Sequence, residues 1–215
     1  MKLYGYFRSS ASYRVRIGLA LKGLGYDSVP VHLTRDGGEQ HRDAYARLNP
    51  QKLIPVLVDR ERAIPQSLAI LEYLEERHPE PPLLPATAGE RARVRSLALA
   101  VACDIHPLNN LRVLAYLTGE LGIDEDAKLR WYRHWVAEGL GALEGALASS
   151  DETGRFCHGD RPTIADCCLV PQVFNARRFD CPLESYPTVI RIEAACLALP
   201  ELERALPENQ PDAKA

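Results

Sequence analysis

Apolar and polar residues alternate with different periods in the first part of the chain. Residues 2–6 form an alternating, strand-like run, residues 29, 31 and 33 are apolar at every second position, and the helix-length segment between these runs has its apolar residues at positions 15, 17, 19, 21 and 24. A period of two indicates strands, and the stretch between them suits a helix that is buried on most sides. A strand, a helix and a strand in this order predict a β-α-β unit with parallel strands and a right-handed crossover.

The following segments extend this unit. A polar loop and a short helix that ends near Asn49 precede the apolar segment 53–58, which is predicted as a third strand. A turn at residues 59–62 returns the chain into a short antiparallel strand at residues 63–64. A helix then covers residues 68–77, and Ser67 is well placed as its N-cap. The predicted order is β-α-β-α-β-β-α.

The second part of the chain has a helical period throughout. Prolines 79, 81, 82 and 85 cannot continue a helix and mark a boundary, so we expect one domain at residues 1–80, a linker at 81–87 and an all-helical domain at 88–215. Helices are predicted at residues 90–117 with a break near Pro107, and at residues 128–148, 163–177 and 187–206. At the start of the third of these, Thr163 and Asp166 have the spacing of a capping box, which indicates a structural role for Asp166.

Composition narrows the class of protein. A length of 215 residues with 46% hydrophobic content suits two compact units, and a net charge of -3 gives no electrostatic reason to expect nucleic-acid binding, which usually requires a clustered basic face. The six cysteines show no C-x-x-C spacing, which argues against a zinc site and against a secreted disulfide framework. Neither a signal core nor a membrane-length apolar stretch is evident, so we expect no membrane association and a cytoplasmic location with reduced thiols.

The turn at Ser9 and Ser10 carries the first candidate chemistry. It joins the first strand to the first helix, where backbone N–H groups and the positive end of the helix dipole point to one place. Two interpretations remain open. One of these serines is an N-cap of the helix, or the hydroxyls and the helix terminus bind an anion or stabilise a thiolate.

Five segments together resemble the zeta class of glutathione transferases over essentially the whole chain: SSASYRVRIGLALKG, LNPQKLIPVL, IPQSLAILEYLEERHP, DIHPLNNLRVL and PTIADCCLVPQVFNARRF. The resemblance implies a thioredoxin-like α/β domain followed by an all-helical domain, a homodimer, and glutathione as cofactor. It implies a cis-trans isomerase whose best-known substrate is maleylacetoacetate. The alternatives are a maleylpyruvate isomerase, a general zeta-class transferase or dehalogenase, and a non-catalytic glutathione-binding module.

The resemblance also assigns residues to the cofactor. Ser9 is expected to stabilise the thiolate with support from Ser10, and Ala11 stands where the family usually has cysteine. Ile54, in an Ile54–Pro55 cis peptide as in similar folds, is expected to pair with the cysteine main chain of glutathione. The remaining expected contacts are Gln66 and Ser67 at the γ-glutamyl carboxylate, Gln40 and Lys52 at the glycyl end, and His106, Asn110 and Arg112 in the second domain.

A dianionic diketo-acid substrate requires cationic anchors. Arg8, which directly precedes Ser9, is the first candidate and is grouped with Ser9 and Ser10 as catalytic. Either Arg177 or Arg178 is the second. Surface exposure is the other interpretation for each arginine and for Gln40 and Lys52, and His106 has the alternative of capping backbone groups freed by Pro107.

Overall fold

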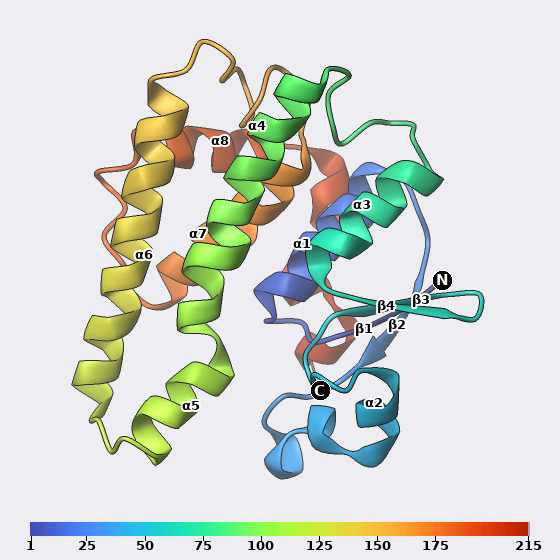
Figure 1. The fold of residues 1–215 in the computed structure, drawn as a ribbon, viewed down its shortest axis with the longest axis vertical. Coiled ribbons are helices and arrows are strands. Elements are labelled where there is room, and N and C mark those ends of the chain that lie inside the picture. Colours follow the sequence, from blue (N-terminus) through green and yellow to red (C-terminus); the bar gives the residue numbers. More distant parts are fainter. Residues whose placement is uncertain (215) are drawn as a thin grey trace. The chain divides into compact units, whose positions relative to one another are not determined.

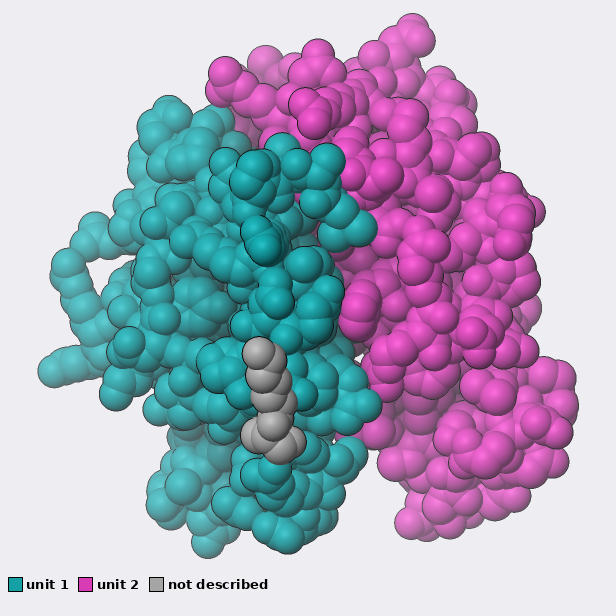
Figure 2. All heavy atoms as spheres, turned by 180° about the vertical axis from the view of Figure 1, so that it is seen from behind, with its two compact units in different colours: residues 1–83, 197–215 teal, residues 84–196 magenta. Residues whose placement is uncertain are grey.

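The computed structural model describes residues 1–214 and divides the chain into two compact units (Figure 2). The first unit consists of Met1–Leu83 and Leu197–Ala215, and the second of Leu84–Cys196. Ala215, the last residue of the expected second domain, lies outside the described residues. The segment from Leu197 onwards therefore groups with the first unit, whereas the sequence placed it with the second.

A four-stranded sheet forms the centre of the first unit (Figure 1). Its strands are β1 (Lys2–Gly5), β2 (Asp27–Pro30), β3 (Val56–Asp59) and β4 (Arg62–Pro65), in the order β2-β1-β3-β4. β1 and β2 are parallel, and β3 is antiparallel to both β1 and β4. The predicted parallel β-α-β unit and antiparallel fourth strand are confirmed.

Two strand boundaries differ from the prediction. β2 lies at Asp27–Pro30 rather than at residues 29–33, because its partner β1 ends at Gly5, which is paired with Pro30. β3 begins at Val56 rather than at residue 53, and the preceding Pro55 has no N–H group to donate to a ladder. In both cases the apolar pattern extends beyond the paired residues, because side chains just outside a sheet can also be buried.

The helices of the first unit are α1 (Ser10–Leu21), α2 (Asp43–Leu48) and α3 (Ser67–Arg77). α1 and α3 lie together on one face of the sheet (Figure 1), and their core consists of the fully buried residues Leu3, Val15, Leu19, Leu57, Ile70 and Leu74. Strand neighbours point to opposite faces, so Tyr4 and Val56 pack instead with Tyr45 of α2. The sheet is thus covered on both faces.

Polar contacts anchor α1 to the rest of its unit. Arg16 is buried and donates from Nε to the Ala205 carbonyl oxygen at 2.9 Å and from Nη2 to the Phe7 carbonyl oxygen at 2.9 Å. Burial lowers the pKa of Arg16 to about 10. Lys22, the C-cap of α1, forms a 2.7 Å ion pair with Glu75 of α3. The hydrogen bond from Arg16 to Ala205 ties residues 200–205 to the first unit.

The second unit contains α4 (Ala88–Leu99), α5 (Leu111–Gly119), α6 (Glu125–Ala148), α7 (Ile164–Arg178) and α8 (Pro187–Leu197). A π-helical segment, Ala100–Ile105, and a 3-10 turn, His106–Asn109, separate α4 from α5, so the break expected near Pro107 is present. α8 ends at Leu197 rather than at residue 206, and Pro200 opens a separate 3-10 helix. Within residues 1–214, none of these helices combines the length and the apolar character needed to cross a membrane.

The capping box at the start of α7 is confirmed. The carboxylate of Asp166 accepts hydrogen bonds from Thr163 N at 2.7 Å, from Thr163 Oγ1 at 2.8 Å and from Cys157 N at 2.9 Å. Asp166 is 1% exposed, so no solvent can replace these bonds if the carboxylate is lost.

Replacing Asp166 by alanine is expected to lower the free energy of unfolding by roughly 2–4 kcal/mol, because several buried donors lose their acceptor. Urea denaturation followed by circular dichroism measures this change. Glu90→Ala is the matched control, since Glu90 completes a capping box with Thr87 at the start of α4 but is only partly buried. An equal loss in both variants would contradict the role of burial.

Candidate active site

Ser9 is both the N-cap of α1 and a partly exposed hydroxyl. Its backbone is extended, with φ -70° and ψ 118°, and its Oγ accepts a hydrogen bond from Ser12 N at 3.2 Å. A hydroxyl oxygen that accepts in this way still has its own O–H group to donate. No acceptor for that O–H group exists among the described residues. The two interpretations of this serine are therefore compatible.

Ser10 and Ala11 occupy the first turn of α1. Ser10 is 5% exposed, so its side chain is directed into the protein, and Ala11 is half-buried. The N–H groups of a first helical turn have no partner within the helix, and the helix dipole adds positive potential there. With Ala11 in place of the cysteine usual in the zeta class, this turn has no thiol but keeps the backbone N–H group of residue 11.

Arg8 lies in the turn just before Ser9 and is exposed. Its Nη2 donates to the Tyr6 hydroxyl at 3.0 Å, and its guanidinium carbon lies 4.9 Å from the centre of the Phe7 ring. These two aromatic residues hold the cation next to the turn without neutralising it, so its charge remains available to an anion.

The residues just before β3 have main-chain groups that are not paired in the sheet. The Ile54–Pro55 bond is cis, as expected, and the sheet ladder begins only at Val56. The Leu53 carbonyl oxygen accepts from the Tyr45 hydroxyl at 2.7 Å and from Asn49 Nδ2 at 2.7 Å. Burial raises the pKa of Tyr45, which keeps its hydroxyl protonated and able to donate. The main chain of Ile54 is thus held in place without being part of the ladder, a geometry suited to pairing with a short extended peptide.

The predicted N-cap of α3 is wrong by one residue. α3 begins at Ser67, and its N-cap is Gln66, whose side chain makes no capping hydrogen bond. Gln66 has a φ of 72° and donates from Nε2 to Gln51 Oε1 at 2.9 Å. Ser67 is 6% exposed, and its Oγ accepts from Nη1 of the buried Arg14 at 3.3 Å. The start of α3 therefore has a hydroxyl but no protein side chain acting as its cap, which suits an anionic ligand.

Gln40 and Lys52 differ in their surroundings. Gln40 is 7% exposed, so the interpretation as a plain surface residue is wrong for it. Its Nε2 donates to the Leu33 carbonyl oxygen at 3.3 Å, whereas its buried Oε1 has no partner among the described residues. Lys52 is exposed, has a φ of 55° and donates its backbone N–H to Asn49 O at 2.9 Å.

The candidates in the second unit also have local roles. His106 begins the 3-10 turn before α5, and Asn110 is the N-cap of α5, where its Oδ1 accepts from Arg112 N at 3.1 Å. Arg177 forms an ion pair with Glu193 of α8. Arg178 is exposed, forms no ion pair within residues 1–214, and places its guanidinium carbon 5.2 Å from the centre of the Phe179 ring. Of the two arginines, Arg178 has the more available charge.

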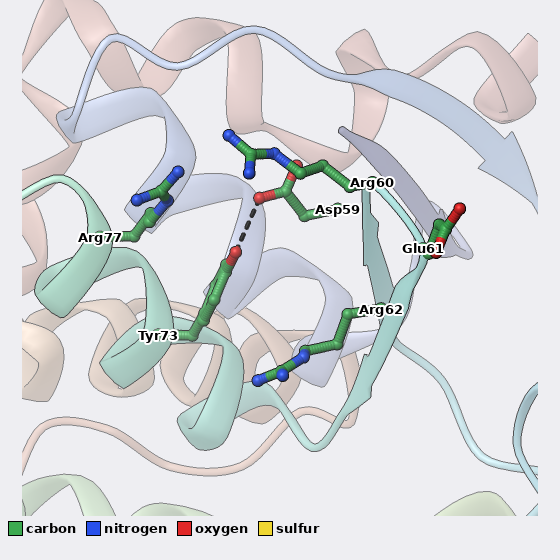
Figure 3. Close-up of a pocket in the computed structure, with 6 residues that line it drawn as sticks. All are labelled: Asp59, Arg60, Glu61, Arg62, Tyr73 and Arg77. Carbon is green, nitrogen blue, oxygen red and sulfur yellow. Dashed lines mark hydrogen bonds between the residues drawn. The ribbon is translucent and has the colours of Figure 1, made fainter.

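An open pocket of about 630 Å³ lies elsewhere in the first unit, between the β3–β4 hairpin and α3 (Figure 3). Its only internal hydrogen bond drawn joins the Tyr73 hydroxyl to Asp59 Oδ2 at 2.7 Å, and Glu61 points away from the others. The residues that line it are Asp59, Arg60, Glu61, Arg62, Tyr73 and Arg77. None of the predicted site residues lies in it. Its lining of mixed charges on an open surface gives no reason to place the chemistry there.

Comparison with known proteins decides the family. Residues 3–82 match the N-terminal domain of glutathione S-transferases, and residues 134–207 match their C-terminal domain. The chain belongs to the glutathione S-transferase family.

Relatives of similar length support this assignment. A probable maleylacetoacetate isomerase of Vibrio cholerae is 54% identical over 98% of this chain and 97% of its own, and a maleylpyruvate isomerase of a Ralstonia species is 49% identical over 99% of both. A structure described as a maleylpyruvate isomerase of the zeta class superposes with a TM-score of 0.95 at 48% identity, over 99% of each chain. A maleylacetoacetate isomerase from Methylobacterium extorquens AM1, solved with malonate and glutathione, has a TM-score of 0.94 at 43% identity over 98% of each chain. The expected resemblance to the zeta class is confirmed.

The sequence did not reveal the residues that support this glutathione-transferase site. Arg14, Tyr45 and Asn49 hold Ser67 and Leu53 in place, yet none of them belongs to a local motif. The one signal was Arg14 itself, a charged residue within an apolar helix, because buried charges in proteins need polar partners. The partner could not be named, since Ser67 lies 53 residues further along the chain.

The protein's own buried thiols are unsuited to act as nucleophiles. All six cysteines are free, and five of them are buried. Burial is the largest cause that raises the pKa of Cys157 and of Cys196, and the nearby carboxylate of Asp166 raises both further. Because a thiolate is the reactive form, burial disfavours the reactive state of these two sulfurs.

The positive φ of Gln66 can be tested by substitution. A φ of 72° favours glycine, so Gln66→Gly is expected to be more stable than Gln66→Ala by about 1 kcal/mol, because only the first relieves the strain. Both variants lose the hydrogen bond to Gln51, which makes alanine the matched control. Urea denaturation of the two variants measures the difference. Equal stability would show that the backbone is not strained here.

Proposed function

We propose that this protein is a glutathione-dependent cis-trans isomerase that converts maleylacetoacetate to fumarylacetoacetate. The observation that carries the proposal is Ser9, a partly exposed hydroxyl that caps α1, accepts from Ser12 N and keeps its own O–H group for a ligand. The names of the full-length relatives, most of them maleylacetoacetate isomerases, support the same activity.

The residues of the first unit fit glutathione along its length. Ile54 offers backbone for the cysteinyl residue, the start of α3 at Gln66 and Ser67 offers donors for the γ-glutamyl carboxylate, and Gln40 and Lys52 are assigned to the glycyl end. The buried Oε1 of Gln40, which has no partner among the described residues, suits a ligand N–H group. From the second unit we assign His106, Asn110 and Arg112 to the same ligand.

Bound glutathione supplies a thiolate, which adds reversibly to the cis double bond and leaves after the resulting single bond has rotated. The protein's part is to favour that anion. A free thiol has a pKa of about 8.5, and a helix N-terminus or a hydrogen-bond donor lowers it. Ser9 donates its O–H group to the sulfur, and the first turn of α1, with Ser10 and Ala11, adds backbone N–H groups and the dipole.

Arginine side chains orient the dianionic substrate. Arg8 is exposed beside Ser9 and is held by Tyr6 and Phe7, so it is the primary anchor. Arg178 is the second anchor in this proposal, because Arg177 is already paired with Glu193. Guanidinium groups suit this role since they bind carboxylates through two parallel hydrogen bonds.

Maleylpyruvate is the second candidate substrate. The Ralstonia relative and a structure from Pseudomonas aeruginosa PAO1 at 50% identity both carry that name, and each is about as similar to this chain as several maleylacetoacetate isomerases. The two substrates share the cis-enone group and two carboxylates, so the same residues serve either of them.

We further propose that the protein acts as a homodimer in the cytoplasm. Six free thiols suit a reducing compartment, and the zeta-class resemblance supports the dimer. Sedimentation velocity at micromolar concentration measures the oligomeric state directly, and a monomer alone would contradict the proposal.

Ser9→Ala is expected to lower kcat on the order of 10²–10³-fold, because the developing anion loses a donor. Ser9→Thr retains the hydroxyl and should recover most of the rate. Ser28→Ala removes an exposed hydroxyl in β2 and serves as the neutral control. Steady-state isomerisation rates decide the outcome, and unchanged turnover in Ser9→Ala would remove Ser9 from the mechanism.

A side-by-side comparison of kcat/KM for maleylacetoacetate and maleylpyruvate tests the substrate. We expect the higher value with maleylacetoacetate. A higher value with maleylpyruvate would transfer the assignment to the second candidate. Glutathione binding without turnover of either diketo acid would refute the proposed enzyme.

A further inference from the structure

Arg14 connects α1 to the N-terminus of α3. It belongs to α1, whose N-terminus is at Ser10, and its Nη1 donates at 3.3 Å to Oγ of Ser67, the first residue of α3. Arg14 is 2% exposed and Ser67 is 6% exposed, so water does not compete for this hydrogen bond. The contact thus joins Ser67, at the start of α3, to α1, the helix that Ser9 caps.

The chemistry of the two groups determines which atom donates. A guanidinium group has five N–H donors and no acceptor, so the hydroxyl oxygen of Ser67 has to accept. The single hydrogen of that hydroxyl is consequently not needed for the bond to Arg14 and remains for another acceptor. The two residue types by themselves fix the direction of this hydrogen bond.

The surroundings of this hydroxyl favour an anion. Ser67 begins an 11-residue helix, and the side chain of the N-cap, Gln66, makes no capping hydrogen bond. The first-turn N–H groups, the dipole of α3 and the buried cation of Arg14 therefore all add positive potential at this point. A hydroxyl that acts as a donor completes a set of groups that complements a carboxylate.

We propose that Arg14 is a positioning residue that makes Ser67 a permanent donor and so gives the site its preference for thiols that carry a carboxylate at the γ-glutamyl end. This proposal rests on the proposed function, because it assigns that end of glutathione to Ser67. Arg14 acts through Ser67 and does not bind the reacting sulfur.

Arg16 provides a matched contrast in the same helix. It is also a buried arginine, but its guanidinium donates to the carbonyl oxygens of Ala205 and Phe7. Arg16 therefore has a structural role, and its replacement reports the cost of disturbing a buried arginine of α1 without touching Ser67.

The experiment compares two thiols by isothermal titration calorimetry. One is glutathione, and the other is γ-aminobutyryl-cysteinylglycine, which lacks only the α-carboxylate of the glutamyl residue. The wild-type protein should bind glutathione more tightly. Arg14→Met is expected to weaken glutathione binding about 10-fold and to change binding of the analogue less than about 2-fold, because charge-assisted hydrogen bonds act only on the carboxylate. In turnover assays the KM for glutathione should rise while kcat changes little.

Conservative variants separate positioning from folding. Arg14→Lys retains a cation and should keep part of the preference for glutathione, whereas Arg16→Lys should alter the binding of both thiols equally. In a Ser67→Ala background, Arg14→Lys should no longer change the ratio of the two affinities. If circular dichroism shows that Arg14→Met does not fold, the comparison of Arg14→Lys with and without Ser67→Ala decides the outcome.

The proposal would be overturned if Arg14→Met weakened the binding of both thiols equally. It would also be overturned if Arg14→Lys still changed the ratio of the two affinities in the Ser67→Ala background. A wild-type protein with no preference between the two thiols would overturn it as well. Because binding is measured without substrate, a failure of isomerisation counts against the proposed function alone and leaves the test of Arg14 valid.

Discussion

The proposed site depends on serine hydroxyls whose oxygens accept hydrogen bonds from the protein. Ser9 accepts from a backbone N–H group within its own helix, and Ser67 accepts from a guanidinium of another helix. In both cases the protein uses the oxygen and leaves the O–H group to a ligand. A hydroxyl whose oxygen already accepts from the protein interacts with a ligand as a donor, and it therefore favours anions. The two ends of glutathione assigned to these serines, the thiolate and the γ-glutamyl carboxylate, are both anionic.

This arrangement requires α1 to be held in place, and contacts at its other end supply that support. Arg204 donates from Nη2 to the carbonyl oxygens of Leu19 at 3.1 Å and Ala20 at 2.8 Å, which places a cation at the C-terminus of the helix. Such a cation complements the negative end of the helix dipole. Lys22 adds the ion pair with Glu75 and donates to the carbonyl oxygens of His78 at 2.7 Å and Pro81 at 2.8 Å. The C-terminal segment and the end of α3 therefore stabilise the helix whose N-terminus we propose as the thiolate site.

The same physical reasoning separates two of the protein's own buried thiols from the proposed thiolate site. Cys157 and Cys196 lie in the interior of the second unit, where burial and the carboxylate of Asp166 both disfavour a thiolate. Asp166 itself is occupied by backbone and hydroxyl donors of the capping box. The helix terminus at Ser9 is the opposite environment, partly exposed and positive, and is suited to a thiolate that arrives with its ligand.

The sequence by itself determined the β-α-β-α-β-β-α order, the all-helical second part, the family and the position of Ser9, because periodicity, prolines and caps are local signals. Only the tertiary structure decided that Ser67 is held by Arg14, that Gln40 is buried, and that Arg177 is paired while Arg178 is not. It also decided that the segment from Leu197 onwards belongs with the first unit. The physical reason is the same throughout. The hydrogen bonds and ion pairs that settle these roles join residues far apart in the chain, and no local pattern records which partner a buried polar side chain will meet.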